Sequence, residues 1–521
     1  MKPWIGRVVA TAALCGGAAP CPALTPAGVW KDLTGALARQ ELTVSAASES
    51  ETAQRLTISD IVLSARKPGF SLSARIGTLT LSATADGSVS ITLDPEIPVD
   101  LTQTLSSGEK LDATVVVSHS GTGVSVTEEN GETRVDLRTD TLEATGRSFR
   151  GDDRSLPVRA QVALRDFSAS RTWSALPYAE VTEEASAATL ALSVDAGAAS
   201  GPGGLSARIA IGDLAASATQ SGPAAEARGD LGTLLRQGMA SQGSARFGPT
   251  EFSLDIRGDR AEISASGHLS GGENALSLTP ARMLYEVTYS GLDLALAGSG
   301  LPMPKASFSL GKARLRAAAP SQQGIAPASI EMRIEFEALA AGEDFWKQFD
   351  PEALLPRDPV TLIVEIGGAA RWLVDIFDVA AVAARARAGR SPAEVSALRI
   401  DRFALSALGA ELSGSGAATA ATAMPGTPPR AVGQASFRLA GGMALLDRLV
   451  ALALVSERQA EALRTAAGLL TRPGEGEDVL TTRIERLPGS ALTVNGSPVP
   501  FPAPVPGESP GNSSTRNETT P

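Results

Sequence analysis

The sequence predicts an α+β, β-rich fold: a long, twisted, mainly antiparallel sheet with bulged strands, a few helices packed on it, and a mixed C-terminal region. From Leu42 to about Glu337 apolar and polar residues alternate with period two, which is typical of strands with one face in water. Asp86-Gly87 separates two such runs and indicates a hairpin. Because aromatic residues are only 4% of the chain, we expect a thin core of aliphatic and small side chains.

Residues 1–23 have the features of a secretory signal peptide. Lys2 and Arg7 form a basic start, an apolar, alanine-rich run follows, and small residues surround Cys21 near the expected cleavage point. We therefore expect a mature chain that begins near Leu24 and is exported to the periplasm. Lipidation of Cys15 or Cys21 is the alternative to ordinary cleavage.

A short helix is predicted directly after this peptide. Thr25 can cap the helix and Pro26 suits its first position. Apolar residues then recur at helical spacing until near Gln40, so this helix has one side with which to dock on the sheet.

One local pattern recurs at five places among the strands. Two alternating apolar positions are followed by a polar or glycine pair, after which the apolar phase has slipped by one residue. A slip would move later side chains to the opposite face, so a β-bulge or a tight two-residue turn must absorb it. Bulges are favoured because several pairs lack the Gly or Asn of a hairpin turn. The pairs are Ser59-Asp60, Arg165-Asp166, Gly212-Asp213, Ser290-Gly291 and Asp401-Arg402.

The pattern becomes mixed from Asp344 onward, and the chain ends in a Pro-rich tail. The predicted elements are a helix over 344–355, a buried strand over 360–366, one or two helices over 369–388, strands over 398–412, a loop over 414–430, and a helix over 442–470 whose apolar stripe packs on the sheet. The predicted organisation is a signal peptide (1–23), a β-rich region with the N-terminal helix (24–340), a mixed α+β region (341–496) and a disordered Pro-rich tail (497–521).

Charge and cysteine content exclude several classes of function. Loss of Lys2 and Arg7 with the signal peptide changes the formal net charge from −11 to −13, which opposes binding to nucleic acid. Both cysteines lie in that peptide, so the mature chain has no thiol for a disulfide, a nucleophile or a metal. No later segment stays apolar over the roughly 20 residues of a transmembrane helix, so none is predicted.

Motifs for nucleophilic or metal chemistry are weak, and the sequence predicts no catalytic, cofactor-binding or metal-binding residue. His119 and His268 have no second histidine or carboxylate at helical spacing, so we interpret both as surface or structural residues. The segment from Gly146 to Gly151 is one residue too long for a nucleophile elbow, and no phosphate-binding loop occurs. The S-x-x-K spacing occurs without a K-T-G partner at Ser64–Lys67, Ser107–Lys110 and Ser309–Lys312.

Two sets of carboxylates are candidates for a calcium site and for an acid–base pair. Glu331, Glu335 and Glu337 share one strand face and could hold calcium, but Arg333 lies on the same face, so a solvated sheet surface is favoured. Asp375 and Asp378 have a spacing common on exposed helices, which gives little support to acid–base chemistry.

Several stretches of the chain resemble an uncharacterised family of alphaproteobacterial proteins, the domain of unknown function 2125. The stretches are Thr25-Pro26, Val29-Trp30, Phe349 to Pro359, Leu408 to Gly416, Glu477 to Leu480, Ile484-Glu485 and Val494-Asn495-Gly496. This resemblance implies an exported bacterial protein and carries over no catalytic residue. A weaker, architectural similarity links the phase-slipping strands to AsmA-like envelope proteins, whose sheets are thought to handle lipids; such a likeness does not fix function.

These observations together favour a non-catalytic, exported envelope protein that binds a lipid or another hydrophobic ligand without a cofactor. The first alternative is a structural or assembly factor that acts through an envelope protein partner. The second is a hydrolase with an unrecognised serine or carboxylate site.

Overall fold

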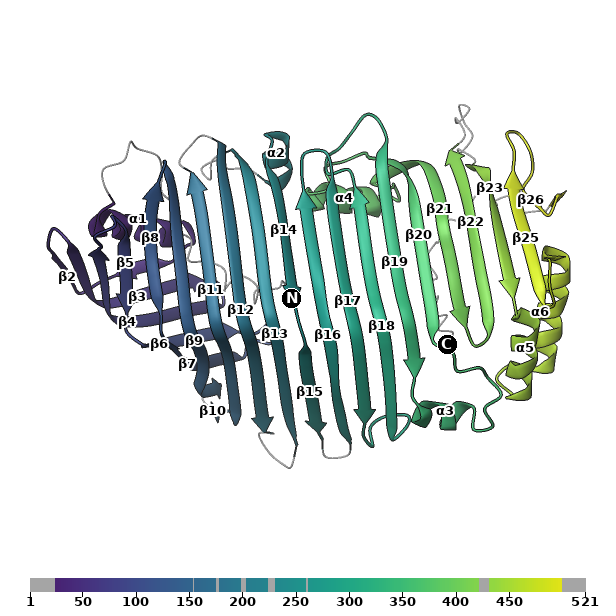
Figure 1. The fold of residues 1–521 in the computed structure, drawn as a ribbon, viewed down its shortest axis with the longest axis horizontal. Helices are drawn as coiled ribbons and strands as arrows, with labels where there is room; N and C mark the ends of the chain where they lie inside the picture. Colours follow the sequence, from purple (N-terminus) through teal and green to yellow (C-terminus); the bar gives the residue numbers. More distant parts are fainter. Residues whose placement is uncertain are drawn as a thin grey trace, which may run out of the picture.

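The computed structural model describes residues 24–152, 154–174, 178–197, 203–223, 230–258, 261–420 and 431–498. The predicted signal peptide and residues 499–521 of the predicted tail lie outside these ranges. Within them the strands form one 27-stranded antiparallel sheet with a few helices at its ends and margins (Figure 1). The predicted fold class is confirmed.

The N-terminal helix α1 (Pro26–Arg39) begins and ends as predicted. The Thr25 Oγ1 accepts a hydrogen bond from the Gly28 backbone N–H at 3.1 Å, and Gln40 is the C-cap. The strands that follow are β1 (Thr43–Ser45), β2 (Ser48–Glu51), β3 (Arg55–Lys67), β4 (Phe70–Ala83), β5 (Val89–Leu93), β6 (Glu96–Thr104), β7 (Lys110–Ser120) and β8 (Gly123–Glu129).

The hairpin predicted at Asp86-Gly87 joins β4 to β5. The Asp86 carboxylate accepts hydrogen bonds from the Thr84 hydroxyl and from the backbone N–H and hydroxyl of Ser88. These bonds lower the pKa of Asp86 to about 2, and the bond from Thr84 makes the largest contribution. Gly87 follows with φ of 86°, a conformation that suits glycine.

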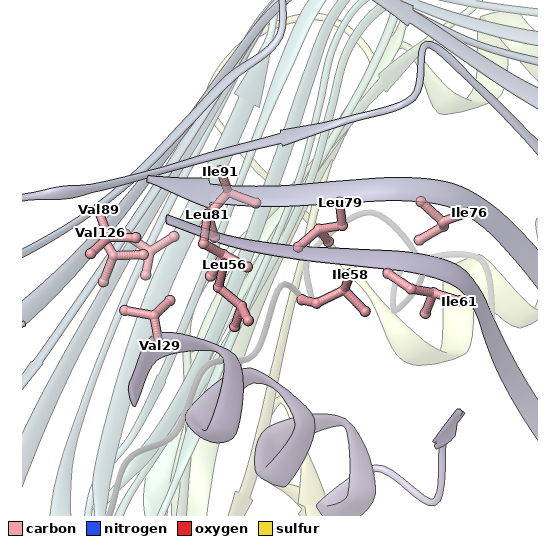
Figure 2. Packing of buried hydrophobic residues seen from close by; sticks show 11 residues of the cluster. Val29, Leu56, Ile58, Ile61, Ile76, Leu79, Leu81, Val89, Ile91 and Val126 are labelled. Carbon is pink, nitrogen blue, oxygen red and sulfur yellow. The ribbon is translucent and has the colours of Figure 1, made fainter. Parts of the chain in front are cut away.

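Helix α1 covers one face of this N-terminal part and builds the main buried cluster. Val29 of α1 points at side chains of β3, β4, β5 and β8, among them the fully buried Ile58, Leu81 and Val89 (Figure 2). Burial of such aliphatic side chains stabilises the structure by about 1.5–3 kcal/mol each. The cluster comprises Val29, Leu56, Ile58, Ile61, Ile76, Leu79, Leu81, Val89, Ile91, Val126 and Val135.

The middle of the sheet is a meander of long strands that pair with their sequence neighbours. The predicted strand-rich region also contains a short helix, α2 (Leu231–Arg236), that the sequence reading missed. The strands are β9 (Glu132–Gly151), β10 (Arg154–Ser155), β11 (Val158–Ser174), β12 (Tyr178–Gly197), β13 (Gly204–Pro223), β14 (Ala240–Phe247), β15 (Thr250–Arg257), β16 (Glu262–Leu278), β17 (Met283–Ala297), β18 (Lys305–Ala319) and β19 (Ala328–Ala341).

The C-terminal part continues the same sheet, because β19 pairs with β20. Its helices are α3 (Glu343–Phe349), α4 (Val379–Arg387), α5 (Gly442–Ala451) and α6 (Glu457–Leu470). Its strands are β20 (Val360–Trp372), β21 (Ala393–Ala407), β22 (Ala410–Ala420), β23 (Ala431–Ala440), β24 (Arg472–Pro473), β25 (Val479–Arg486), β26 (Thr493–Val494) and β27 (Ser497–Pro498).

Several sequence predictions in this part are wrong in extent. The helix predicted over 344–355 ends at Phe349, because the buried Asp350 carboxylate binds the N–H groups of Leu354 and Leu355 in a turn. Strand β20 continues to Trp372, so only 379–387 of the predicted 369–388 is helical. Strand β22 occupies residues 414–420 of the predicted loop, whose remaining residues 421–430 lie outside the described ranges. Ser497 and Pro498 of the predicted tail form β27.

The long predicted helix over 442–470 is two helices, α5 and α6, at the C-terminal edge of the sheet (Figure 1). Ser456 caps α6 and pairs with Gln459 in a capping box, which starts a second helix. Of the stripe predicted to be core, Leu446 and Ala460 are buried, whereas Leu463 and Leu470 are 53% and 47% exposed. The two helices pack mainly on each other rather than across the sheet, so one side of α6 remains in solvent.

The five phase slips are absorbed inside continuous strands, so the hairpin-turn alternative is wrong at all of them. A register shift, the mark of a bulge, occurs only at Asp401-Arg402, where β21 slips against both β20 and β22. At the other four pairs the register is the same before and after the slip. There the second residue has a left-handed backbone: Asp60 (φ 52°), Asp166 (φ 49°), Asp213 (φ 49°) and Gly291 (φ 64°).

Three of these left-handed residues, Asp166, Asp213 and Gly291, belong to a line that crosses the sheet, which we call the crease. Each member lies opposite the next on the neighbouring strand, except that the register places Gly248 opposite Gly271, one residue from Ser270. Left-handed backbone recurs in it at Asp166, Asp213, Gly291 and Ala338. The members are Asp140, Asp166, Ala188, Asp213, Gly248, Ser270, Gly291, Gly311 and Ala338.

The crease keeps apolar side chains of both strand halves on one face. Leu164 and Phe167 flank Asp166 at an odd spacing that would send them to opposite faces of a regular strand. Both are instead buried in one cluster, with Leu190 and Leu214 of the neighbouring strands packed against them. The left-handed residue therefore corrects the phase of the side chains, which the sequence analysis attributes to a bulge.

Replacement of a crease glycine should destabilise the sheet. Gly291→Ala is expected to lower the free energy of unfolding by roughly 1–3 kcal/mol, because its φ is left-handed and a Cβ would meet the Ser270 side chain. Urea denaturation measures the change. The matched control is Gly123→Ala in β8, whose added Cβ has no atom within 4 Å. An equal loss in both variants would contradict the role of the crease.

Candidate functional surface

The sheet has one apolar face, defined by cross-strand rows of large aliphatic and aromatic side chains. Below the crease one row runs from β11 to β18 through residues that are paired in register. Val162, Leu192 and Ile209 of this row are 36%, 39% and 37% exposed. The row comprises Val162, Leu192, Ile209, Phe252, Gly267, Leu294 and Phe308.

Above the crease the same face continues to the C-terminal edge of the sheet. Tyr289 and Phe336 are each 41% exposed, and Met332, two rows away on the same face, is 37% exposed. The row that starts at β17 comprises Tyr289, Ala313, Phe336, Leu362, Leu405, Leu412, Leu439 and Leu480.

Glycines on this face let aromatic rings lie flat across it. A Cβ on Gly267 would collide with the Phe252 ring, and one on Gly414 with the Phe437 ring. Gly272 lies in the same way beneath Phe247. A ring that covers a cross-strand glycine stabilises both strands and leaves a smooth apolar surface.

Little of the apolar face is covered in the described part of the chain. Helix α1 covers the first strands, and α5 contacts β22. Between β11 and β21, α3 packs on one end of β18 through the Phe308–Phe345 ring contact at 5.7 Å, and elsewhere the described strands contact mainly their hydrogen-bonded neighbours. A large apolar surface left in water marks an interaction site.

The opposite face is polar and carries a ladder of ion pairs on β17 to β20. Glu286 binds Arg314 and Arg316, the latter at 2.7 Å, and Arg333 binds Glu365 at 3.1 Å. Glu335 is 3% exposed and receives Arg333 at 3.3 Å. The two faces therefore differ in kind: one is charged and internally paired, the other apolar.

The ladder lowers the pKa of its carboxylates. Burial by itself would raise the pKa of Glu286, but the hydrogen bonds and charges of Arg314 and Arg316 outweigh it, so the pKa lies below 4.5. A hydrogen bond with Glu337 lowers the pKa of Glu335, burial opposes this, and Arg333 lowers it further.

The carboxylates that are candidates for a calcium site or for acid–base chemistry form structural contacts. Glu331, Glu335 and Glu337 share the polar face, as predicted, and pair with Arg282 or with Lys312 and Arg333. Asp375 binds Arg236 of α2 at 2.8 Å, and Asp378 caps α4. No group of three or more potential metal ligands occurs in the described ranges.

The weak catalytic motifs do not assemble a reactive centre. The three S-x-x-K lysines each bind a carboxylate: Lys67 binds Glu41, Lys110 binds Asp112, and Lys312 binds Glu335 and Glu337. The segment from Gly146 to Gly151 is the end of strand β9 rather than a strand–turn–helix.

The two histidines have separate partners. The His119 Nε2 contacts the Asp94 carbonyl oxygen at 2.8 Å. The His268 Nδ1 lies 3.3 Å from Asp293, which sequence spacing could not reveal because the partner is on the neighbouring strand. No serine hydroxyl hydrogen-bonds to His268 among the residues whose positions are described.

Two of the hollows in the described surface include residues of the apolar face. The larger of the two, about 990 Å³, runs across the strands from β11 to β19. Its lining includes six members of the lower apolar row, from Leu192 to Phe308, and neighbouring residues that include Glu251, His268 and Asp293. The smaller, about 310 Å³, lies on the apolar face across β21, β22, β23 and β25. No cross-strand signal in the sequence indicated either.

Comparison with protein-family models, with curated proteins and with solved structures finds no match to this chain. The resemblance to the domain of unknown function 2125 remains a prediction. None of the described helices is both long and apolar enough to traverse a bilayer.

Acid should weaken the ion-pair ladder. A carboxylate whose pKa is lowered on folding contributes stability above its ordinary pKa, here 4.5, and loses that contribution as the pH falls through the lowered value. We expect Glu286→Gln to unfold about 1–2 kcal/mol more easily at pH 7 and to lose less stability than the parent protein below pH 4.5. Thermal denaturation between pH 7 and 3 measures both.

The control for this series is Glu411→Gln on β22, since Glu411 forms no ion pair among the described residues. An unchanged pH dependence in Glu286→Gln would contradict the assignment of acid sensitivity to the ladder.

Proposed function

We propose that this protein is a non-catalytic, exported envelope protein that binds the acyl chains of lipids along its apolar face. The observation that carries the proposal is the exposure of the large side chains between β11 and β21, where α3 on β18 is the main cover that the described chain supplies. Acyl chains would remove these side chains from water, at about 25 cal/mol for each Å² buried.

The dimensions of the face support acyl chains as occupants. Neighbouring strands lie about 4.8 Å apart, so the face extends about 40 Å from β11 to β21. This exceeds the hydrocarbon thickness of a bilayer, about 30 Å, so extended chains would fit across the strands.

The distribution of polar groups also favours lipid over a protein partner. The rows that define the apolar face contain no charged side chain, whereas the core of a protein interface is held in register by hydrogen bonds spaced through it. The ion pairs of β17 to β20 satisfy one another on the opposite face. The apolar face thus offers burial without directional contacts, which suits flexible chains of variable length.

A charge placed on the apolar face should reduce lipid binding. We expect the full chain, purified without detergent, to carry lipid that mass spectrometry identifies, and Ile209→Glu to carry much less because a buried carboxylate is costly. The matched control is Ala210→Glu, which should retain the lipid because successive side chains of a strand point to opposite faces.

Two results would count against the proposal. If the folded parent protein carries no lipid, the lipid-binding proposal is wrong and the assembly-factor alternative is favoured. Crosslinking in cells would then identify the partner. Equal lipid loss in both variants, with unchanged thermal stability, would show that binding does not use the apolar face.

A further inference from the structure

The smaller hollow lies at the C-terminal end of the apolar face, and its centre is built from small residues. Its floor crosses the strands through Gly416, Ala418, Gly433 and Ala435. A Cβ on Gly416 would lie 2.9 Å from the Ala435 Cα, so a larger side chain would fill the space. Its walls are Leu398, Ile400, Ile484 and Leu492.

One charged side chain, Arg486, is present among the described residues that line this hollow. The register of β25 places Arg486 on the apolar face. Arg486 pairs with Gly433 and, two residues from Ile484, shares the face of that side chain. It is half-buried, and its Nε atom is enclosed without a hydrogen-bond partner. No described residue forms an ion pair or hydrogen bond with its guanidinium.

Arg486 differs in this respect from the arginine nearest to it on the same strand. Arg483 lies on the polar face, where its guanidinium binds Gln434 at 2.8 Å and Glu485 at 3.7 Å. A partly desolvated guanidinium without an anion is unfavourable, and its planar fork matches the two oxygens of a carboxylate or phosphate.

We propose that Arg486 binds the anionic headgroup of an amphiphile whose acyl chain lies on the apolar face. This inference rests on the proposed function and adds to it the chemistry of the ligand: a carboxylate or phosphate group joined to a hydrocarbon chain. The volume of about 310 Å³ is at the lower end for a ligand pocket and suits a headgroup alone. The chain would leave the hollow along the row that contains Ile400 and Met332.

The test compares three probes of equal chain length on the full protein: decanoate, decyl phosphate and decanol, each measured by displacement of Nile red. The parent protein is expected to bind at least one anionic probe about tenfold more tightly than decanol, because the guanidinium forms charge-assisted hydrogen bonds with the anion. The preferred anion distinguishes a fatty acid from a phospholipid headgroup.

Arg486→Gln should remove this preference and leave decanol affinity unchanged, whereas Arg486→Lys should retain part of it. Arg483→Gln is the matched control on the opposite face and should keep the full preference. Because Arg486 has no described partner, the melting temperature of Arg486→Gln should not fall, which separates loss of the site from misfolding.

The outcomes separate the two proposals. Failure of all three probes to bind the folded parent protein would overturn the proposed function and this inference with it. Binding of decanol as tightly as both anions, or an unchanged preference in Arg486→Gln, would overturn the headgroup site alone.

Discussion

The constraint on which this structure depends is that every long strand must keep its apolar side chains on one face. Strict alternation would fail wherever an apolar spacing is odd, as between Leu164 and Phe167. A left-handed residue in the strand corrects the phase without changing the pairing, and neighbours such as Asp166 and Asp213 lie close to one line. The correction is thus a property of the whole sheet, and a single strand could not adopt it without its neighbours.

A sheet divided so completely into two faces does not need a second layer to keep its register. Ion pairs such as Arg314 with Glu286 hold the polar face, and rings laid over glycine, such as Phe437 over Gly414, hold the apolar one. Only at the N-terminus, under α1, is a deep core built (Figure 2). The apolar face beyond it is therefore free to serve binding rather than folding.

Local patterns predicted the elements whose cause is local. The Thr25 cap, the hairpin at Asp86-Gly87 and the places of the phase slips depend on neighbouring residues, and all could be read from the sequence. The extent of β20 and β22 could not, because runs of Gly and Ala suit a strand only when a particular neighbour lies alongside. The exposure of Leu463 and the hollow at Arg486 depend on where whole elements lie, which periodicity does not encode.

Arg486 is unusual because it is a charged side chain on the apolar face of the sheet. On the polar face arginines form ion pairs with nearby carboxylates, so a charged side chain there does not by itself indicate a binding site. On the apolar face no described carboxylate is close to Arg486, and small residues hold open a hollow beside it. The enclosed Nε of Arg486 has no hydrogen-bond partner in the described chain, so an anion from outside it would supply one.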